Sequence, residues 1–98
     1  MNTYHLSVVT PAGKVFEGEA ESLVAPGVEG SFGVLAGHAP MIVGLKKGPF
    51  TLRTKDQTRY YTISPGILEI SGQNKVLLLS DEVVEKQSAE EAKPPVTH

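Results

Sequence analysis

The sequence predicts an all-β protein, an antiparallel β-sandwich or flattened barrel that ends in a short tail. Three observations predict this fold. Apolar and polar residues alternate with a period of two, segments with glycine or proline interrupt the alternation at short intervals, and no amphipathic helical pattern precedes residue 81. At least eight strands are expected, over residues 4–9, 15–25, 31–35, 41–45, 50–54, 59–63, 67–70 and 76–80.

Most of these strands show simple alternation, but strand 15–25 is irregular. It carries Glu17, Glu19 and Glu21 along one face, and then three apolar residues that place bulk on both faces. We therefore expect this strand to bend or bulge near Ser22.

The segments between the strands have the composition of tight turns. Two of them, 55–58 and 71–75, join neighbouring strands as hairpin tips, and Gly66 is free to take a positive φ. The remaining expected turns are 11–13, 26–30, 36–40, 46–49 and 64–66.

The composition changes after residue 81. Residues 85–93 are polar and have the pattern of two helical turns, with Asp81 or Ser88 as the N-cap, but Pro94 ends that pattern. Because an isolated helix this short is marginal in water, we expect residues 85–98 to form a frayed, acidic tail.

The size and charge of the chain restrict its function. Its 98 residues suit one hydrophobic core, which we place in a β-sandwich domain over residues 1–84. There is no cysteine, which excludes disulfides and thiolate metal sites. The net charge of −2 argues against a nucleic-acid partner, which needs a basic surface.

Nothing in the sequence predicts direct membrane insertion. The longest apolar run, residues 76–79, is far too short to span a bilayer, and residues 1–5 lack the features of a signal peptide. We expect any membrane association to be indirect, through a partner.

Glycines recur in the middle of the chain at positions 27, 30, 33 and 37. Their spacing is not that of a dinucleotide-binding fingerprint, and strands lie on both sides of them. They are better explained by tight turns and close backbone approach, so we expect no nucleotide site here.

The histidines, His5, His38 and His98, do not have metal-ligand spacing, and we expect no metal or other cofactor. His38 lies between Gly37 and Pro40, which fix the backbone around it. Three interpretations of His38 remain open: an imidazole bonded to loop carbonyls, a contact residue at a protein interface, or a general base.

Carboxylates suggest one enzymatic alternative. Glu17, Glu19 and Glu21 carry carboxylates, the groups that glycosidases use for catalysis, although three like charges in a row are more typical of a solvated strand face. A small β-sandwich hydrolase or carbohydrate-binding module would use His38 with Glu29. This alternative requires one cleft that holds both groups.

Apolar residues in and beside the glycine- and proline-rich loops exceed what so small a core can bury. An apolar patch presented by tight loops is more often a docking surface than a catalytic one, so the residues by themselves predict an all-β adaptor that binds protein. The residues concerned are Val9, Val28, Phe32, Leu35, Met41, Val43 and Leu45.

Three segments resemble a known family. YHLSVVTP at residues 4–11, the segment 25–40 with its Pro-Gly-x-Glu-Gly and Gly-His-Ala-Pro motifs, and YTISPGILEI at residues 61–70 are similar to the epsilon subunit of bacterial F-type ATP synthase, called delta in mitochondria. The resemblance covers about residues 3–84.

This resemblance implies a ten-stranded β-sandwich in the central stalk, a non-catalytic subunit that joins the gamma subunit to the c ring. It would rotate with both and help couple proton translocation to ATP synthesis. Its implied location is the cytoplasmic face of a bacterial inner membrane, as a peripheral part of the complex.

The resemblance also assigns surfaces, residue by residue. The loop that faces the polar loops of the c ring is Val28, Glu29, Gly30, Ser31 and Phe32. The gamma-facing side includes Thr10, His38, Ala39, Met41, Ile42 and Val43.

Two departures from the family pattern matter. Many relatives have an acidic residue at the position of Ser31, so charge pairing with the c ring would rest mainly on Glu29. The family's C-terminal helical hairpin begins with a nucleotide motif, and the matching residues 89–94 lack its arginine and end in proline. We therefore expect neither the hairpin domain nor ATP sensing, although a nucleotide sensor built on residues 85–93 is a testable alternative.

Overall fold

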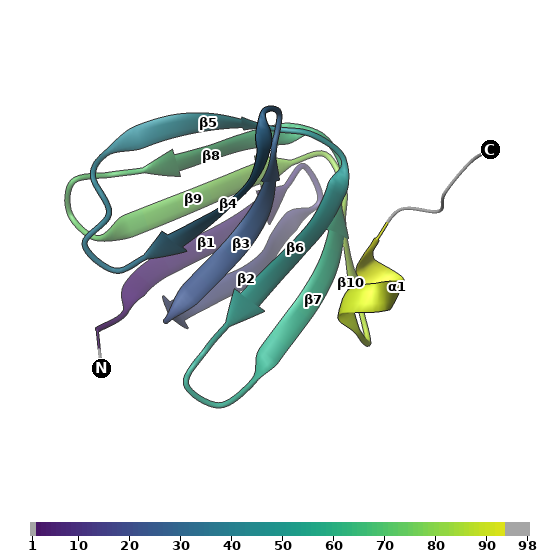
Figure 1. The fold of residues 1–98 in the computed structure, drawn as a ribbon, viewed down its shortest axis with the longest axis horizontal. Helices are drawn as coiled ribbons and strands as arrows, with labels where there is room; N and C mark the ends of the chain where they lie inside the picture. The colour runs from purple at the N-terminus through teal and green to yellow at the C-terminus, as the bar shows by residue number, and fades with distance from the viewer. Residues whose placement is uncertain (1, 94–98) are drawn as a thin grey trace.

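The computed structural model describes residues 2–93, which form ten strands and one short helix (Figure 1). The elements are β1 (Tyr4–Thr10), β2 (Gly13–Ala20), β3 (Ser22–Gly27), β4 (Gly30–Leu35), β5 (Met41–Leu45), β6 (Gly48–Arg53), β7 (Thr58–Ile63), β8 (Gly66–Ile70), β9 (Lys75–Ser80), β10 (Val83–Lys86) and α1 (Ala89–Ala92). The expected all-β sandwich is confirmed.

The strands pack as two layers that are joined at one corner (Figure 1). One layer contains β4, β3, β6, β7 and β10, and the other contains β5, β8, β9, β1 and β2. The layers meet where Gly27 of β3 pairs with Leu45 of β5. All pairs are antiparallel except β1 with β9, which the sequence pattern did not predict.

The long irregular strand divides at Glu21, one residue before the expected bend. Up to Ala20 the chain pairs with β1, and from Ser22 it pairs with β6 of the other layer. The Glu21 N–H donates to the Arg53 carbonyl at 2.8 Å, which fixes the crossing. After the switch Leu23 and Ala25 face the core, whereas Val24 lies on the outer face and is exposed.

The core lies between the two layers and is formed by alternate residues of nearly every strand. At its centre the rings of Phe50 and Tyr61 stack with centroids 5.4 Å apart. The Tyr4 hydroxyl is buried and donates to the Val34 carbonyl at 3.0 Å, which joins the first strand to the opposite layer. Leu45, expected among the surplus surface residues, is instead buried in this core.

The C-terminal segment is more ordered than the sequence indicated. Strand β10 continues past residue 84 to Lys86, and Ser88 caps α1 by accepting from the Glu91 N–H at 3.2 Å. Ala92 is fully buried, and its carbonyl accepts from the Thr62 hydroxyl. The frayed tail expected from residue 85 is therefore wrong for residues 85–93, because docking on the sandwich supplies contacts that an isolated helix lacks.

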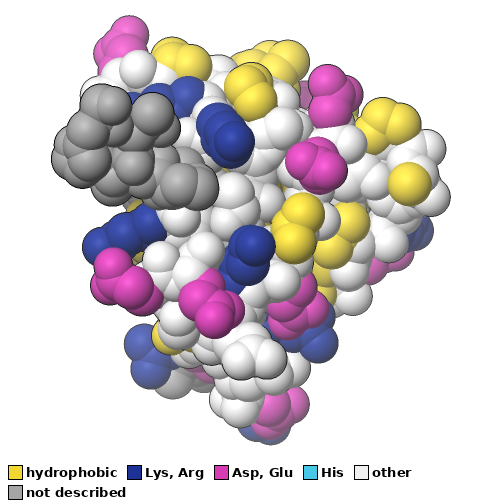
Figure 2. Space-filling view, turned by 90° about the vertical axis from the view of Figure 1, so that its right-hand side faces the viewer, with side chains coloured by type: hydrophobic (Ala, Val, Ile, Leu, Met, Phe, Trp, Pro, Cys, Tyr) yellow, Lys and Arg dark blue, Asp and Glu magenta, His cyan; other side chains and the backbone are white. Residues whose placement is uncertain are grey.

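Pro94 and the rest of the predicted tail, residues 94–98, lie outside the described residues. Figure 2 shows the side of the molecule next to α1 and β10, where acidic and basic side chains intermix and apolar ones form small groups.

Candidate protein-docking surfaces

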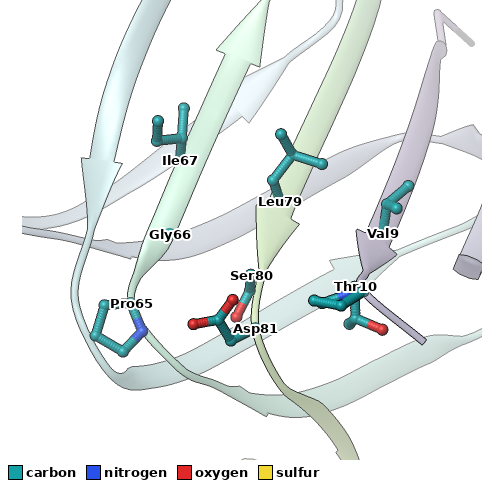
Figure 3. A pocket seen from close by; sticks show the side chains of 9 residues that line it. Val9, Thr10, Pro65, Gly66, Ile67, Leu79, Ser80 and Asp81 are labelled. Atoms are coloured by element: carbon teal, nitrogen blue, oxygen red, sulfur yellow. The ribbon is translucent and has the colours of Figure 1, made fainter. Parts of the chain in front are cut away.

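A row of exposed and half-buried apolar side chains crosses the outer face of the second layer. Residues that pair directly across neighbouring strands share a face, and pairing places Ile67 of β8, Leu79 of β9 and Val9 of β1 in one line. Ile67 is 48% and Leu79 43% exposed. Figure 3 shows these three side chains on adjacent strands. We call Val9, Ile67 and Leu79 the outer row.

The outer row borders a shallow depression at one end of the sheet (Figure 3). Thr10, Pro65, Gly66 and Asp81 also line this depression, whose volume is about 350 Å³. Its surface is mostly carbon, and Asp81 supplies one carboxylate at the rim. Exposed apolar surface of this kind is suited to binding another protein.

The β3–β4 hairpin forms a second projecting feature. Its tight tip requires glycine at two positions. Gly30 has a φ of +130°, and a Cβ on Gly27 would lie only 2.7 Å from the Gly30 carbonyl oxygen. The Val28 N–H donates to the Gly44 carbonyl at 3.0 Å, so the tip is fixed against β5. Val28 is 61% exposed, and Glu29 beside it is also exposed.

Between this hairpin and β5 lies a groove of about 520 Å³, which we call the β4–β5 groove. Among residues 2–93, β4 pairs with β3 alone and so has a free edge beside the groove, whereas β5 is joined to the β3–β4 hairpin at one end, through the Gly27–Leu45 pair and the Val28–Gly44 hydrogen bond. The candidate site residues that line the groove are Val28, Glu29, Gly30, Ser31, Phe32, His38, Met41, Ile42 and Val43.

The groove thus brings together nearly all the candidate site residues. The five residues expected to face the c ring and four of those expected to face gamma line the same groove. Ala39 lies exposed in the adjoining loop, whereas Thr10 lies apart, beside the outer row.

His38 and Glu29 both line the groove, as the enzymatic alternative requires. The His38 ring is engaged elsewhere, however, with Nδ1 2.8 Å from the Ala39 carbonyl oxygen. Within residues 2–93, no hydrogen bond or ion pair joins His38 to Glu29. The geometry matches the interpretation of His38 as an imidazole bonded to a loop carbonyl.

The acidic side chains of β2, Glu17 and Glu19, take part in local ion pairs and hydrogen bonds. Glu17 lies beside the Lys14 ammonium and 3.1 Å from His5 Nε2, and hydrogen bonds from Lys14 and His5 lower the pKa of its carboxyl. Glu19 accepts from the Thr3 hydroxyl at 2.6 Å. The described residues contain no group of three or more side chains arranged to hold a metal, and His98 lies beyond them.

The sequence analysis missed two members of the outer row, Ile67 and Leu79. A signal for both was present, because Ile67-Leu68 and the run 76–79 carry apolar residues at consecutive strand positions. Consecutive apolar residues in a strand point to opposite faces, so one of each pair had to be outside the core or under a partner.

Fold and surface together define a class of module, a small β-sandwich with an apolar sheet face and a projecting hairpin, which are features suited to binding other proteins. Within residues 2–93, no helix is long and apolar enough to cross a bilayer.

Comparison with known proteins identifies the family. Residues 3–86 match the family model of the ATP synthase delta/epsilon chain, beta-sandwich domain. The ATP synthase epsilon chain of Helicobacter acinonychis is 41% identical over 86 residues, which are 88% of this chain and 70% of that one. The epsilon chain of Chlorobaculum tepidum is 43% identical over 81 residues, 82% of this chain and 91% of that one. The chain belongs to the ATP synthase delta/epsilon family and is of the epsilon type, a non-catalytic subunit.

Two solved structures have the same fold. A chain in the mitochondrial ATP synthase of Euglena gracilis, solved as OSCP/F1/c-ring, superposes with a TM-score of 0.81 at 20% identity over 91% of this chain and 58% of that chain. A chain in the central stalk/c-ring structure of the Tetrahymena thermophila enzyme gives 0.72 at 14% identity over 81% and 63%. This chain therefore spans about 60% of the length of each of these two chains.

Proposed function

We propose that this chain is a central-stalk rotor subunit that joins the gamma subunit to the c ring and helps couple proton translocation to ATP synthesis. The observation that carries the proposal is the outer row, an apolar sheet face open to a partner in a chain of the epsilon type. The Tetrahymena chain with this fold comes from a central stalk/c-ring structure, which supports the proposal.

In this proposal gamma binds the second layer. The contact would extend from Thr10 and the outer row across the sheet to Ile42, which is 69% exposed on the same outer face. From there it would continue over the edge of β5 to Met41 and Val43 and to the adjoining loop with His38 and Ala39. A few well-packed, fully desolvated contacts near the centre of an interface supply most of its affinity, and the outer row would lie near the centre of this one.

The c ring would meet the tip of the β3–β4 hairpin. Val28 and Glu29 project there, with Gly30, Ser31 and Phe32 behind them. A carboxylate at an exposed tip contributes only about 0.2–1 kcal/mol to an ion pair, so Glu29 would set the register on the ring rather than the affinity. Because the groove borders β5, the two partners would lie next to one another.

The complex also defines where the chain would work. We expect a peripheral position on the cytoplasmic face of a bacterial inner membrane, held there through the c ring and not by contact with lipid. The similar epsilon chains named above are bacterial.

The test is binding of the intact chain to purified gamma subunit. Leu79→Asp places a charge in the outer row and is expected to weaken binding at least about tenfold, because a buried unpaired carboxylate is costly at an interface. Val24→Asp is the matched control, since Val24 is 47% exposed but lies on the outer face of the opposite layer.

The outcomes separate the two parts of the proposal. Equal loss of binding in both variants would indicate unfolding, which circular dichroism would detect. Wild-type binding by Leu79→Asp would mean that gamma does not dock on the outer row, and no binding by the wild type would contradict the rotor assignment itself.

The hairpin contact is tested separately in reconstituted complexes. Glu29→Lys should lower coupled ATP synthesis, whereas Asp56→Lys, at the tip of the β6–β7 hairpin, should leave it unchanged. Equal effects of the two substitutions would contradict a specific role for the β3–β4 tip.

A further inference from the structure

The loop of residues 36–40, which joins β4 to β5, is held to the rest of the fold at few points. Ala36 packs partly against the core, and the β8–β9 turn lies close to the loop at Pro40, since a Cβ built on Gly72 would be 3.3 Å from Pro40 Cγ. Within residues 2–93, the loop makes one hydrogen bond to another part of the chain, from the Gly37 N–H to Asn74 Oδ1 at 3.0 Å.

Asn74 makes three connections from the β8–β9 turn. Its Oδ1 accepts from Gly37, its Nδ2 donates to the Thr3 carbonyl at 2.6 Å, and its own carbonyl accepts from the His5 N–H at 3.0 Å. One side chain therefore bridges the 36–40 loop and the residue that precedes β1, segments more than thirty positions apart.

The backbone at this position favours asparagine over most residues. Asn74 has a φ of 61°, and it is the one residue other than glycine with a positive φ among residues 2–93. Asparagine tolerates this left-handed conformation, whereas most side chains are strained there. The Asn74 side chain is exposed, so packing in the core does not explain why asparagine occupies this position. Its amide is instead used for two hydrogen bonds.

We propose that Asn74 is a positioning residue that holds the 36–40 loop, and with it His38 and Ala39, in the conformation that binds gamma. This inference rests on the proposed function, since it takes that loop as part of the gamma surface. A loop fixed before binding loses less conformational entropy on association. Asn74 would thus raise affinity without touching the partner.

Two substitutions at this position separate its hydrogen bonds. Asn74→Gly removes both side-chain bonds but keeps the turn, because glycine takes positive φ without strain. Asn74→Asp keeps an acceptor for the Gly37 N–H and removes the donor to Thr3. Gln73→Ala, in the same turn, is the matched control.

The first measurement is the NMR order parameter of the Gly37, His38 and Ala39 amides in the free protein. We expect order parameters of about 0.85 in the wild type, in Asn74→Asp and in the control, and below about 0.6 in Asn74→Gly. The second measurement is gamma affinity. A lost hydrogen bond of ordinary strength predicts an affinity about 2- to 10-fold weaker for Asn74→Gly and nearly unchanged for Asn74→Asp.

The results distinguish failure of this inference from failure of the proposed function. Unchanged loop order in Asn74→Gly overturns the positioning role, and so does a freed loop with unchanged gamma affinity. If the wild type does not bind gamma, the proposed function fails, while the order parameters still decide whether Asn74 holds the loop.

Discussion

Gly66 gives the sharpest test of the packing described above. It lies at the start of β8, where it pairs with Leu45 on one side and Ser80 on the other. An ideal Cβ at this position would lie 1.9 Å from the Leu79 carbonyl oxygen and 2.9 Å from its carbonyl carbon. Neither atom can rotate away, because both belong to the backbone of β9.

The magnitude follows from this geometry. Cβ atoms almost never approach another heavy atom closer than 3.0 Å, so Gly66→Ala would require β8 and β9 to separate by about 1 Å at this pair. A shift of that size breaks ladder hydrogen bonds and opens the core. We expect a loss of at least about 3 kcal/mol in the free energy of unfolding, equivalent to a fall in Tm of roughly 12–24 °C for a domain of this size.

Gly33→Ala is the matched control for this substitution. Gly33 also lies in a strand and also has no positive φ, but its nearest neighbour would be the Leu23 carbonyl oxygen at 3.6 Å, an ordinary contact. We expect this variant to be stabilised by about 0.5 kcal/mol, because alanine restricts the unfolded chain more than glycine does. Both variants are measured by thermal unfolding with circular dichroism. A Tm for Gly66→Ala within about 3 °C of the wild type would refute the steric argument.

Three further predictions concern stability and pH. Burial raises the pKa of Tyr4, so the folded state keeps this phenol neutral above about pH 10, where the unfolded chain ionises. The free energy of unfolding should therefore fall as pH rises beyond about 10, and less steeply in Tyr4→Phe. It is measured by urea unfolding at a series of pH values, and an equal fall with pH in the two proteins would contradict this. Phe50→Ala should cost about 3–5 kcal/mol, because it removes a buried ring stacked on Tyr61; a loss below about 1 kcal/mol would show that this stack is not central to the core. Ala92→Asp should release α1 by burying a carboxylate, with faster proteolysis at residues 87–93 and a smaller fall in Tm than for Phe50→Ala; unchanged proteolysis would mean that α1 does not depend on this contact.

The docking surfaces show that the grouping of candidate residues in space depends on the tertiary fold and could not be predicted from the sequence. Residues 28–32 and residues 38–43 looked like separate candidate surfaces along the chain. They line one groove because the last residue of β3, Gly27, pairs with Leu45 of β5, which brings the tip of the β3–β4 hairpin against β5 at Gly44. Thr10 was grouped with His38, yet it lies in the depression beside the outer row, because β1 and β5 are separated by β8 and β9.

The sequence by itself determined the fold class and the positions of most strands and turns, because period-two alternation and turn residues are local signals that act within a few positions. It also carried the family motifs, which lie in continuous segments. Only the tertiary structure decided the parallel pairing of β1 with β9, the exposure of Ile67 and Leu79 in one row, and the burial of Ala92. Each of these depends on which strands become neighbours and in what register, and that choice is made by packing between residues far apart in the chain.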